Sequence, residues 1–317
     1  MEFIVKKTTE LSVQEIGQIN QLFETVFGKH RSEQEFLNQS VNNPLGYSYH
    51  SMMVDNGVIV GLNSFVPSYY IVKGRRMLFA NSTDSMVSKL YRDFFNFNDM
   101  VTAGFNMMKK DGVTYVYGYP NDNSYPVLIK SKLYRDIGKM HTYCLPLHIG
   151  GMKKGLKFLN PLSELLCRIY VGTAGIFASS ETEKYLIEKD SESYNESRYK
   201  RGDGIYNIVR LGDITVYYKI KEHEGVRTAF IVDISRKSPN AFNKAVRHII
   251  HNHRKDFDLL LYPGNLGFSN TSMIRIPRKF EPKNFNFTGK ALDKKAFDES
   301  IWDIRNWDTN LSNYDLI

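Results

Sequence analysis

Residues 81–97 contain a place where the chain could bind an anionic ligand. The residues up to Val87 have the pattern of a strand, and a helix is expected from about residue 95 to residue 110. The first turn of a helix presents unpaired backbone amides and the positive end of the helix dipole, and both suit phosphate groups. Arg92 adds a positive charge just before this turn. The passage therefore predicts a phosphate site between a strand and a helix.

A second break in the chain is expected beside this one. Residues 113–119 form an almost wholly apolar strand, which Pro120 and Asn121 stop. If this strand and the one ending near Val87 are splayed apart, their backbone groups stay free for a ligand that contains amides. The two breaks together predict one binding site at the ends of neighbouring strands.

Other signatures of chemistry are missing from the sequence. It has no Walker loop, zincin helix, Gly-x-Ser-x-Gly elbow or kinase signature. Cys144 and Cys167 lack a His-Asp context, so we expect them to be structural. His248 and His251 could share a helix face, but no third metal ligand is suitably spaced, and the helix dipole alone favours histidine at a helix end. We therefore predict no metal site.

The composition indicates a folded protein with about two domains. The chain has 317 residues, of which 42% are hydrophobic and 24% charged. Its net charge is +8, but the basic residues are scattered, so we expect a solvated basic surface and no nucleic-acid partner. Neither a signal peptide nor a membrane-spanning stretch is evident, which makes a cytoplasmic protein the default expectation.

The elements that would position the site alternate along the first 150 residues. Capping boxes at Ser12 and Ser32 predict two helices, the first of which ends near Phe27. Strands follow with tight turns at residues 55–57 and 73–75. The helix after Arg92, the apolar strand and a short helix come next, and one strand over residues 137–147 closes this part. The pattern is that of a mixed-sheet α/β domain.

Residues 150–182 form a connector with a helix of its own. Its amphipathic pattern would suit a membrane surface. We expect it to pack between two domains instead, because its polar face has no stripe of basic residues.

The second half of the chain repeats part of the first. A strand that contains Asp233, a helix over residues 241–254, an apolar strand and a Tyr-Pro break at Tyr262 follow in the same order as around Asp84 and Tyr119. We infer an internal duplication and predict domains at residues 1–149 and 183–317.

These features resemble the GNAT superfamily of acyl-CoA N-acyltransferases, and within it the two-domain bacterial members associated with surface polysaccharides. The resemblance is carried by residues 81–87, 90–92 and 117–121, and it extends over about residues 3–147. Residues 183–280 look like a degenerate second copy, and the end of the chain is similar to tails in that group. The resemblance implies a tandem GNAT-like α/β fold with mixed sheets.

The resemblance also implies roles for individual residues. Asp84 falls where a carboxylate could act as a general base. The cofactor would be acetyl-CoA or another acyl-CoA, and the acceptor would be an amine or a hydroxyl, for instance that of an amino sugar. Its pantetheine arm would meet the backbone at Met86, Val87 and Ser88, and Asn121 would face that arm. The pyrophosphate would be held by the loop residues Arg92, Asp93, Phe94, Phe95, Asn96 and Phe97.

Two features depart from the family's pattern. Phe95 and Phe97 stand where the family loop has glycines, which let the backbone approach a phosphate. The tyrosine that would protonate the leaving thiolate is also missing from its usual place, so Tyr125 is the candidate substitute. Two alternatives therefore stay open: a GNAT-fold binding protein without catalysis, and a Fem-type aminoacyl transferase that uses charged tRNA, which would need a basic strip.

Overall fold

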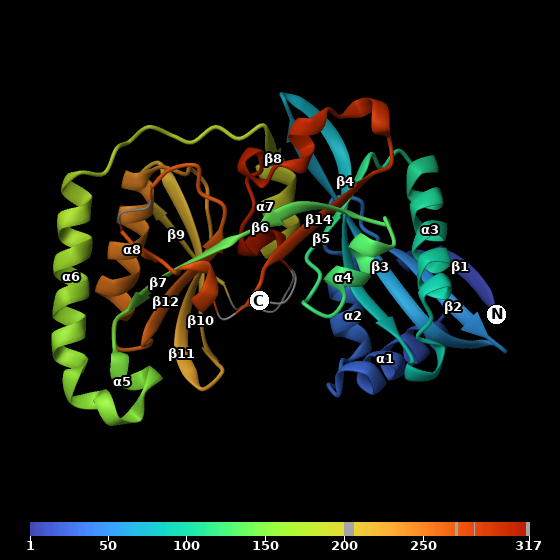
Figure 1. Ribbon diagram of the computed structural model, residues 1–317, viewed down its shortest axis with the longest axis horizontal. Helices are drawn as coiled ribbons and strands as arrows, with labels where there is room; N and C mark the ends of the chain where they lie inside the picture. The colour runs from blue at the N-terminus through green and yellow to red at the C-terminus, as the bar shows by residue number, and fades with distance from the viewer. Residues whose placement is uncertain (200–205, 270–271, 282, 315–317) are drawn as a thin grey trace. The chain divides into compact units, whose positions relative to one another are not determined.

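A computed structural model describes residues 1–199, 206–269, 272–281 and 283–314 (Figure 1). The chain divides into two compact units that interleave along the sequence. Unit 1 comprises Met1–Gly138, Leu186–Gly204 and Asn286–Asn306, and unit 2 comprises Lys139–Tyr185, Ile205–Phe285 and Trp307–Ile317. The sequence instead predicted contiguous domains at 1–149 and 183–317, because composition and periodicity carry no sign of a chain that returns to an earlier unit.

The first two helices of unit 1 begin where their capping boxes predicted. They are α1 (Val13–Phe27) and α2 (Glu33–Val41). At the start of each helix a serine hydroxyl accepts a hydrogen bond from the backbone amide three residues later. The side chain of the glutamate at that later position accepts a hydrogen bond from the serine backbone amide. Gly28, with φ 66°, ends α1 in the left-handed conformation that glycine adopts without strain.

The sheet of unit 1 is mixed. Its strand order is β1-β2-β3-β4-β5-β14-β6, and β8 pairs with β3. The two predicted tight turns are confirmed, because Asn56, Gly57, Lys73 and Gly74 all have positive φ between paired strands. The bounds are β1 (Glu2–Lys7), β2 (Tyr49–Asp55), β3 (Val58–Val72), β4 (Arg75–Val87), β5 (Tyr115–Gly118), β6 (Arg135–Lys139), β8 (Ile187–Lys189) and β14 (Asn286–Ala291).

Helix α3 (Phe94–Lys110) connects β4 to β5 and packs on the sheet. Met100, Phe105 and Met108 of α3 share a buried cluster with Phe65 and Val116 of the strands. Two shorter helices, α4 (Tyr125–Lys130) and α7 (Ser191–Tyr199), complete the helices of this unit in the described residues. The long helix α3 therefore starts at the carboxyl end of β4, where the phosphate site was predicted.

The strand predicted over residues 137–147 is two strands in two different sheets. β6 ends at Lys139 and lies in unit 1, whereas β7 (His141–Pro146) lies in unit 2. Gly138 has φ 144°, a backbone conformation that other residues rarely adopt, directly before the change of sheet. The apolar alternation continues across the break, so the pattern predicted one strand.

The sheet of unit 2 has the strand order β13-β7-β12-β11-β10-β9. Its strands are β9 (Asn207–Leu211), β10 (Ile214–His223), β11 (Val226–Ile234), β12 (Leu259–Gly264) and β13 (Ile274–Arg275). Its helices in the described residues are α5 (Ile149–Met152), α6 (Asn160–Ile176) and α8 (Pro239–His253). The buried side of α6 packs within this unit, where Asn243 Nδ2 of α8 donates to Val171 O at 2.8 Å.

The two units share the arrangement that the internal repeat predicted. β4 and β5 are parallel and joined by α3, and β11 and β12 are parallel and joined by α8. In each sheet the strand beyond β5 or β12 comes from a distant part of the chain, β14 in unit 1 and β7 in unit 2. The predicted tandem, mixed-sheet α/β fold is confirmed.

Among the described residues no helix combines the length and apolarity that a membrane crossing needs.

Candidate functional site

Strands β4 and β5, which were predicted to hold the ligand, separate from each other at a defined point. We call this point the β4–β5 fork. β4 pairs with β5 only from Phe79 to Ser82, opposite Tyr115 to Gly118. Beyond Ser82, β4 continues to Val87 with β3 as its partner. Met86 and Val87, predicted to meet the pantetheine arm, lie in this second part, and Ser88 N bonds back to Val60 O of β3 at 2.8 Å. The splaying expected from the sequence is present.

A bulge distorts β4 at the fork. Thr83 pairs with Ser64 and Met86 pairs with Leu62, so β4 has more residues than β3 over this stretch. Asp84, within the bulge, has φ 48°, a left-handed conformation that is uncommon outside glycine. Backbone strain of this kind clusters at functional sites and persists only where the surroundings impose it.

Asn63 of β3 is the residue that ties the bulge down. Its side chain is buried, and its Nδ2 donates to Ser82 Oγ at 3.1 Å. Its Oδ1 accepts a hydrogen bond from the Ser85 hydroxyl. Because Asn63 holds both sides of Asp84, the strained residue keeps one position without help from a ligand.

The carboxylate of Asp84 is held by Arg31, which the sequence analysis missed. Arg31 Nη1 lies 2.5 Å from Asp84 Oδ2, and the arginine side chain is only 4% exposed. Its Nε donates to Asn20 at 3.0 Å, and its guanidinium lies 4.1 Å from the ring centre of Phe23. No local pattern joins residues 53 positions apart. Arg31 thus positions the candidate base from the loop between α1 and α2.

A buried histidine lies in β2, the strand that pairs with β3 on the side away from β4. His50 of β2 has its ring nitrogens 2.9 Å from Thr8 Oγ1 and 3.0 Å from Ser64 Oγ. Burial, with a smaller contribution from the charge of Arg31, lowers the pKa of His50 to about 3. His50 is therefore neutral near pH 7, and its two hydroxyl partners satisfy both ring nitrogens.

The predicted phosphate site has a carboxylate in it. Asp93 caps α3, and its side chain accepts from the amides of Phe95 and Asn96 at 2.7 and 3.3 Å. These are the amides at which the pyrophosphate was predicted. Arg92 is exposed, and its Nε donates to Val87 O at 3.1 Å. A diphosphate at this helix start would therefore have to replace the Asp93 carboxylate.

The two phenylalanines at the glycine positions of the family loop have different surroundings. Phe97 packs against the core of unit 1, whereas Phe95 is 72% exposed. The side chain of Phe94 lies outside the described residues. The ring of Phe97 thus belongs to the fold, and the ring of Phe95 lies at the surface beside the helix start.

Asn121 and Tyr125 have partners in their own part of the chain. Asn121 Oδ1 accepts from the amides of Asn123 and Ser124 at 3.0 Å each and so shapes the turn before α4. The Tyr125 hydroxyl donates to Asp136 at 2.9 Å. Burial and then this hydrogen bond raise the pKa of Tyr125 to about 12. Tyr125 therefore keeps its proton at neutral pH, as a general acid must, but has that proton engaged with Asp136.

Comparison with known proteins shows what this arrangement is similar to. Residues 7–138 match the family described as the acetyltransferase (GNAT) domain. The match covers less than half of the chain, and over this part the chain is similar to a GNAT acetyltransferase domain. It comprises nearly all of the first segment of unit 1, including the β4–β5 fork, Arg31 and Asp84. No curated protein sequence matches the chain.

Solved structures share the fold over most of the chain. A probable N-acyltransferase from Enterococcus faecalis aligns with TM-score 0.57 and 13% identity over 95% of this chain and 75% of that one. A GCN5-related N-acetyltransferase from Anabaena variabilis gives 0.59 and 12% over 92% and 73%. N-myristoyltransferase from Saccharomyces cerevisiae, with bound myristoyl-CoA, gives 0.52 and 8% over 90% and 82%. The likeness in fold therefore extends beyond residues 7–138 into unit 2.

The equivalent place in unit 2 is filled by the chain itself. β11 pairs with β12 only from Thr228 to Phe230, and beyond that point lies the final segment of the chain. Asn265 N donates to Thr309 O at 2.8 Å, and Asn265 Nδ2 donates to Trp307 O at 2.9 Å. Gly264 and Asn310 form a β-bridge. We call residues 307–314 the tail; they occupy the β11–β12 fork.

A buried charge cluster fastens the tail. Lys237 Nζ lies 3.1 Å from Asp233 and 2.8 Å from Asp308, and Asn310 Nδ2 donates to Asp233 at 2.8 Å. Burial alone would lower the pKa of Lys237, but the two carboxylates raise that pKa well above its ordinary value. The lysine therefore stays charged. Asp233, which has the position in the second copy of the repeat that Asp84 has in the first, is bound to the tail.

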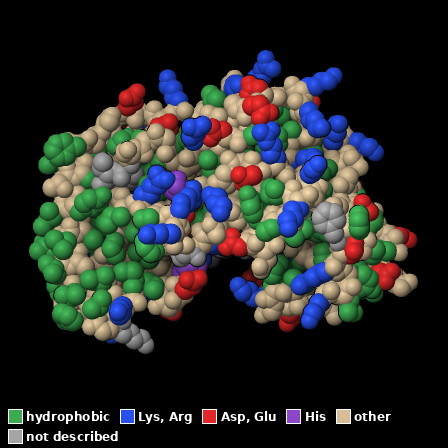
Figure 2. All heavy atoms as spheres, in the orientation of Figure 1, with side chains coloured by type: hydrophobic (Ala, Val, Ile, Leu, Met, Phe, Trp, Pro, Cys, Tyr) green, Lys and Arg blue, Asp and Glu red, His purple; other side chains and the backbone are tan. Residues whose placement is uncertain are grey.

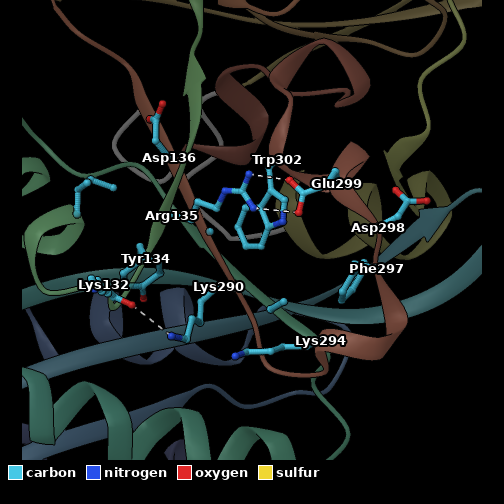
Figure 3. A pocket seen from close by; sticks show the side chains of 13 residues that line it. Lys132, Tyr134, Arg135, Asp136, Lys290, Lys294, Phe297, Asp298, Glu299 and Trp302 are labelled. Carbon is cyan, nitrogen blue, oxygen red and sulfur yellow. Dashed lines mark hydrogen bonds and ion pairs between the residues drawn. The ribbon is translucent and has the colours of Figure 1, made fainter.

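A pocket of about 890 Å³ lies beside β14 and β6 of unit 1 (Figure 3). Gly289 and Ala291, in its lining, pair with Tyr117 and Tyr115 of β5, and Asp136, the hydrogen-bond partner of Tyr125, also lines it. Arg135 makes two hydrogen bonds to Glu299, at 3.2 and 2.7 Å, beside the ring of Trp302. The lining includes none of the residues predicted for the site.

Proposed function

We propose that the protein is an acyl-CoA-dependent N-acyltransferase whose site is the β4–β5 fork. The observation that carries this proposal is the parting of β4 from β5 beside the left-handed Asp84. It leaves the end of β4 without its β5 partner just where an amide-containing arm would lie. The match of residues 7–138 to a GNAT acetyltransferase domain supports the same assignment. Acetyl-CoA is the donor that we propose, and other acyl-CoA thioesters are alternatives.

When bound, the thioester supplies an activated acyl group that an amine or hydroxyl of the acceptor attacks directly. Asp84 would take the proton from the acceptor, as an aspartate held in place by Arg31 can do. Backbone amides of β4 would stabilise the oxyanion. Tyr125 would protonate the leaving thiolate after it leaves Asp136, because its hydroxyl proton is otherwise engaged. Met86, Val87, Ser88 and Asn121 remain our proposal for the pantetheine contacts.

The narrower form of this proposal concerns the acceptor. We infer an amino sugar of a cell-envelope polymer, because the resemblance of the sequence is strongest to two-domain members associated with polysaccharides. The acceptor would reach Asp84 on the side that Arg31 leaves open, since the carboxylate is 22% exposed while the arginine covers it from the loop between α1 and α2.

A second candidate function rests on Asp93. Its carboxylate occupies the amides that would hold the pyrophosphate, and Phe95 takes the place of a glycine. A GNAT-fold protein that binds the acceptor without a CoA partner would have this appearance. The Fem-type alternative has no such support, since no basic strip is evident in the sequence.

Calorimetric titration of the full chain with acetyl-CoA tests the proposal. We expect a micromolar dissociation constant and, with an amino-sugar acceptor, release of free CoA thiol. Absence of heat at millimolar acetyl-CoA would overturn the transferase and favour the binding protein. Heat without thiol release from any amine or hydroxyl acceptor would support donor binding but contradict catalysis.

A further inference from the structure

Helix α6 carries an apolar face that the protein leaves exposed. Leu162, Leu165, Leu166, Ile169, Ile176 and Phe177 are between 52% and 83% exposed. Their spacing of three, four and seven residues places those within the helix on one side of it. We call these six residues the α6 face. Figure 2 shows hydrophobic side chains gathered over this helix at the left of the view. Contiguous apolar surface of this kind marks an interaction site.

The opposite side of α6 is already used by unit 2. Ser163, Cys167, Val171 and Ala174 are buried. Ser163 Oγ donates to Leu147 O at 2.8 Å, and Cys167 Sγ lies 3.3 Å from Pro146 O. The helix therefore uses this side against unit 2 and cannot turn its apolar face onto that unit.

The charges around the α6 face indicate what covers it. Residues 149–180 contain Lys153, Lys154, Lys157 and Arg168, and Glu164 is the one acidic residue in this stretch of sequence. Glu164 is partly buried and lies 3.4 Å from Arg254 and 3.8 Å from Arg168. Lys153, Lys157 and Arg168 are exposed. An apolar face whose helix carries one exposed cation, and whose preceding segment carries two more, complements a surface that is apolar inside and anionic at its rim.

We propose that the α6 face docks the protein on an anionic lipid bilayer, with α6 lying along the membrane surface. The leucine and isoleucine side chains would enter the acyl region, and Phe158, 76% exposed in the turn before α6, would extend the contact. Lys153 and Lys157 would meet lipid phosphates. Arg168 would reach the headgroups while its aliphatic stem stays in the apolar layer. This binding is independent of the β4–β5 fork.

The position of Arg168 favours lipid over a second copy of the chain. Arg168 stands at the middle of α6, which spans Asn160–Ile176. A two-fold pairing of antiparallel α6 helices would bring the two Arg168 residues together. Glu164 lies 3.8 Å from Arg168 but also contacts Arg254 and His148, so it offsets only part of this repulsion.

Flotation of the full chain with vesicles tests the proposal. The probes are vesicles of phosphatidylglycerol and phosphatidylcholine in equal parts, and vesicles of phosphatidylcholine alone. We expect binding to the anionic vesicles that weakens with salt, and weaker binding to the neutral ones. The double substitution Leu165→Glu with Ile169→Glu should lower the partition coefficient at least tenfold. Replacing Lys153, Lys157 and Arg168 by Gln should lower it about fivefold for each charge on anionic vesicles only.

A matched control places glutamates on exposed apolar positions elsewhere. Val13→Glu with Val58→Glu changes residues that are 75% and 53% exposed in unit 1, and should leave flotation unchanged. Urea unfolding of each variant checks that the fold is kept. The proposal is overturned if the unmodified chain floats with neither vesicle. It is equally overturned if sedimentation shows a dimer that Leu165→Glu with Ile169→Glu dissociates, because a second copy then covers the face.

Discussion

The β4–β5 fork and the β11–β12 fork contain the same elements, but their aspartates differ in exposure and in partners. In each unit a parallel strand pair parts after a few residues, a helix connects the strands, and an aspartate lies near a bulge in the first strand. In unit 1 Asp84 is 22% exposed and bonded to one buried arginine, and Ser85 beside it is exposed. In unit 2 Asp233 is 7% exposed and enclosed by Lys237 and the tail.

The difference between the two forks shows that the partners of the separated strands decide whether the fork can bind a ligand or is buried within the protein. Strands that part leave backbone groups without partners, and these groups must bond to something. In unit 2 Asn265 and the tail supply the partners from the chain itself. In unit 1 Asn63 and Arg31 fasten only the side chains of the bulge. We therefore expect unit 2 to contribute stability at its fork and unit 1 to contribute chemistry.

The largest effect is expected from breaking the charge cluster of unit 2. Lys237→Met should lower the free energy of unfolding of unit 2 by about 3–5 kcal/mol, because it leaves Asp233 and Asp308 buried without their cation. The two tryptophans of the chain separate the units, since Trp302 belongs to unit 1 and Trp307 to unit 2. Urea unfolding followed by Trp307 fluorescence in a Trp302→Phe background measures the effect.

The matched control for this variant is Lys244→Met. Lys244 is also a lysine of unit 2, but it is 48% exposed and 3.9 Å from Asp213, so its loss should change stability by less than about 0.5 kcal/mol. Equal midpoints for Lys237→Met and Lys244→Met would show that the cluster does not hold the tail.

The next effect concerns chemistry in unit 1. Asp84→Asn should lower kcat at least about 100-fold, because asparagine cannot take the acceptor's proton. Asparagine tolerates the left-handed backbone at this position, so the affinity for acetyl-CoA should stay within about twofold. Initial rates and calorimetry measure the two effects. Asp303→Asn, which changes an aspartate of unit 1 paired only locally with Arg305, is the control and should retain full activity. Unchanged turnover in Asp84→Asn would remove Asp84 from the reaction.

Acid should weaken unit 1 through His50. Its pKa of about 3 lies below the ordinary value of 6.5, so between these values the unfolded chain binds a proton that the folded chain does not. Stability is therefore lost as the pH falls from 6.5 toward 3, by about 2 kcal/mol at pH 5. Trp302 fluorescence in a Trp307→Phe background should report this loss, and His50→Gln should abolish it. A loss of equal size in His50→Gln would assign it to other groups.

The smallest effect tests the helix start of α3. Asp93→Asn keeps a capping side chain but removes the negative charge from the predicted phosphate site. We expect acetyl-CoA to bind about three- to tenfold more tightly, because the diphosphate no longer meets a carboxylate. Calorimetry measures the change. Weaker binding would show that the Asp93 charge is not opposed to the ligand. The same substitution at Asp99, further along α3, should have little effect.

Local patterns in the sequence predicted the elements of the fold well. Capping boxes at Ser12 and Ser32, the turns at Gly57 and Gly74, and the repeat around Asp84 and Asp233 are all present, because each depends on residues close together in the chain. The tandem α/β fold followed from their order. The site residues themselves, from Asp84 to Asn121, stay predictions that the binding and activity measurements will test.

Three features could not be predicted because they join distant residues. Arg31 reaches Asp84 from 53 positions away, with no motif to mark the pair. The continuous apolar alternation over residues 137–147 does not show that β6 and β7 belong to different sheets. The tail fills the β11–β12 fork through Asn310 and Asp308, whose polar sequence is typical of a loop.

By itself, therefore, the sequence determined which segments are helices and strands and that two similar strand–helix–strand arrangements exist, because hydrophobic period and capping are local properties. Only the tertiary structure decided which sheet each strand joins, which fork the chain fills and which aspartate keeps some exposure to solvent. Those outcomes depend on which unpaired backbone groups and buried charges meet partners from far along the chain, and such meetings exist only in the folded molecule.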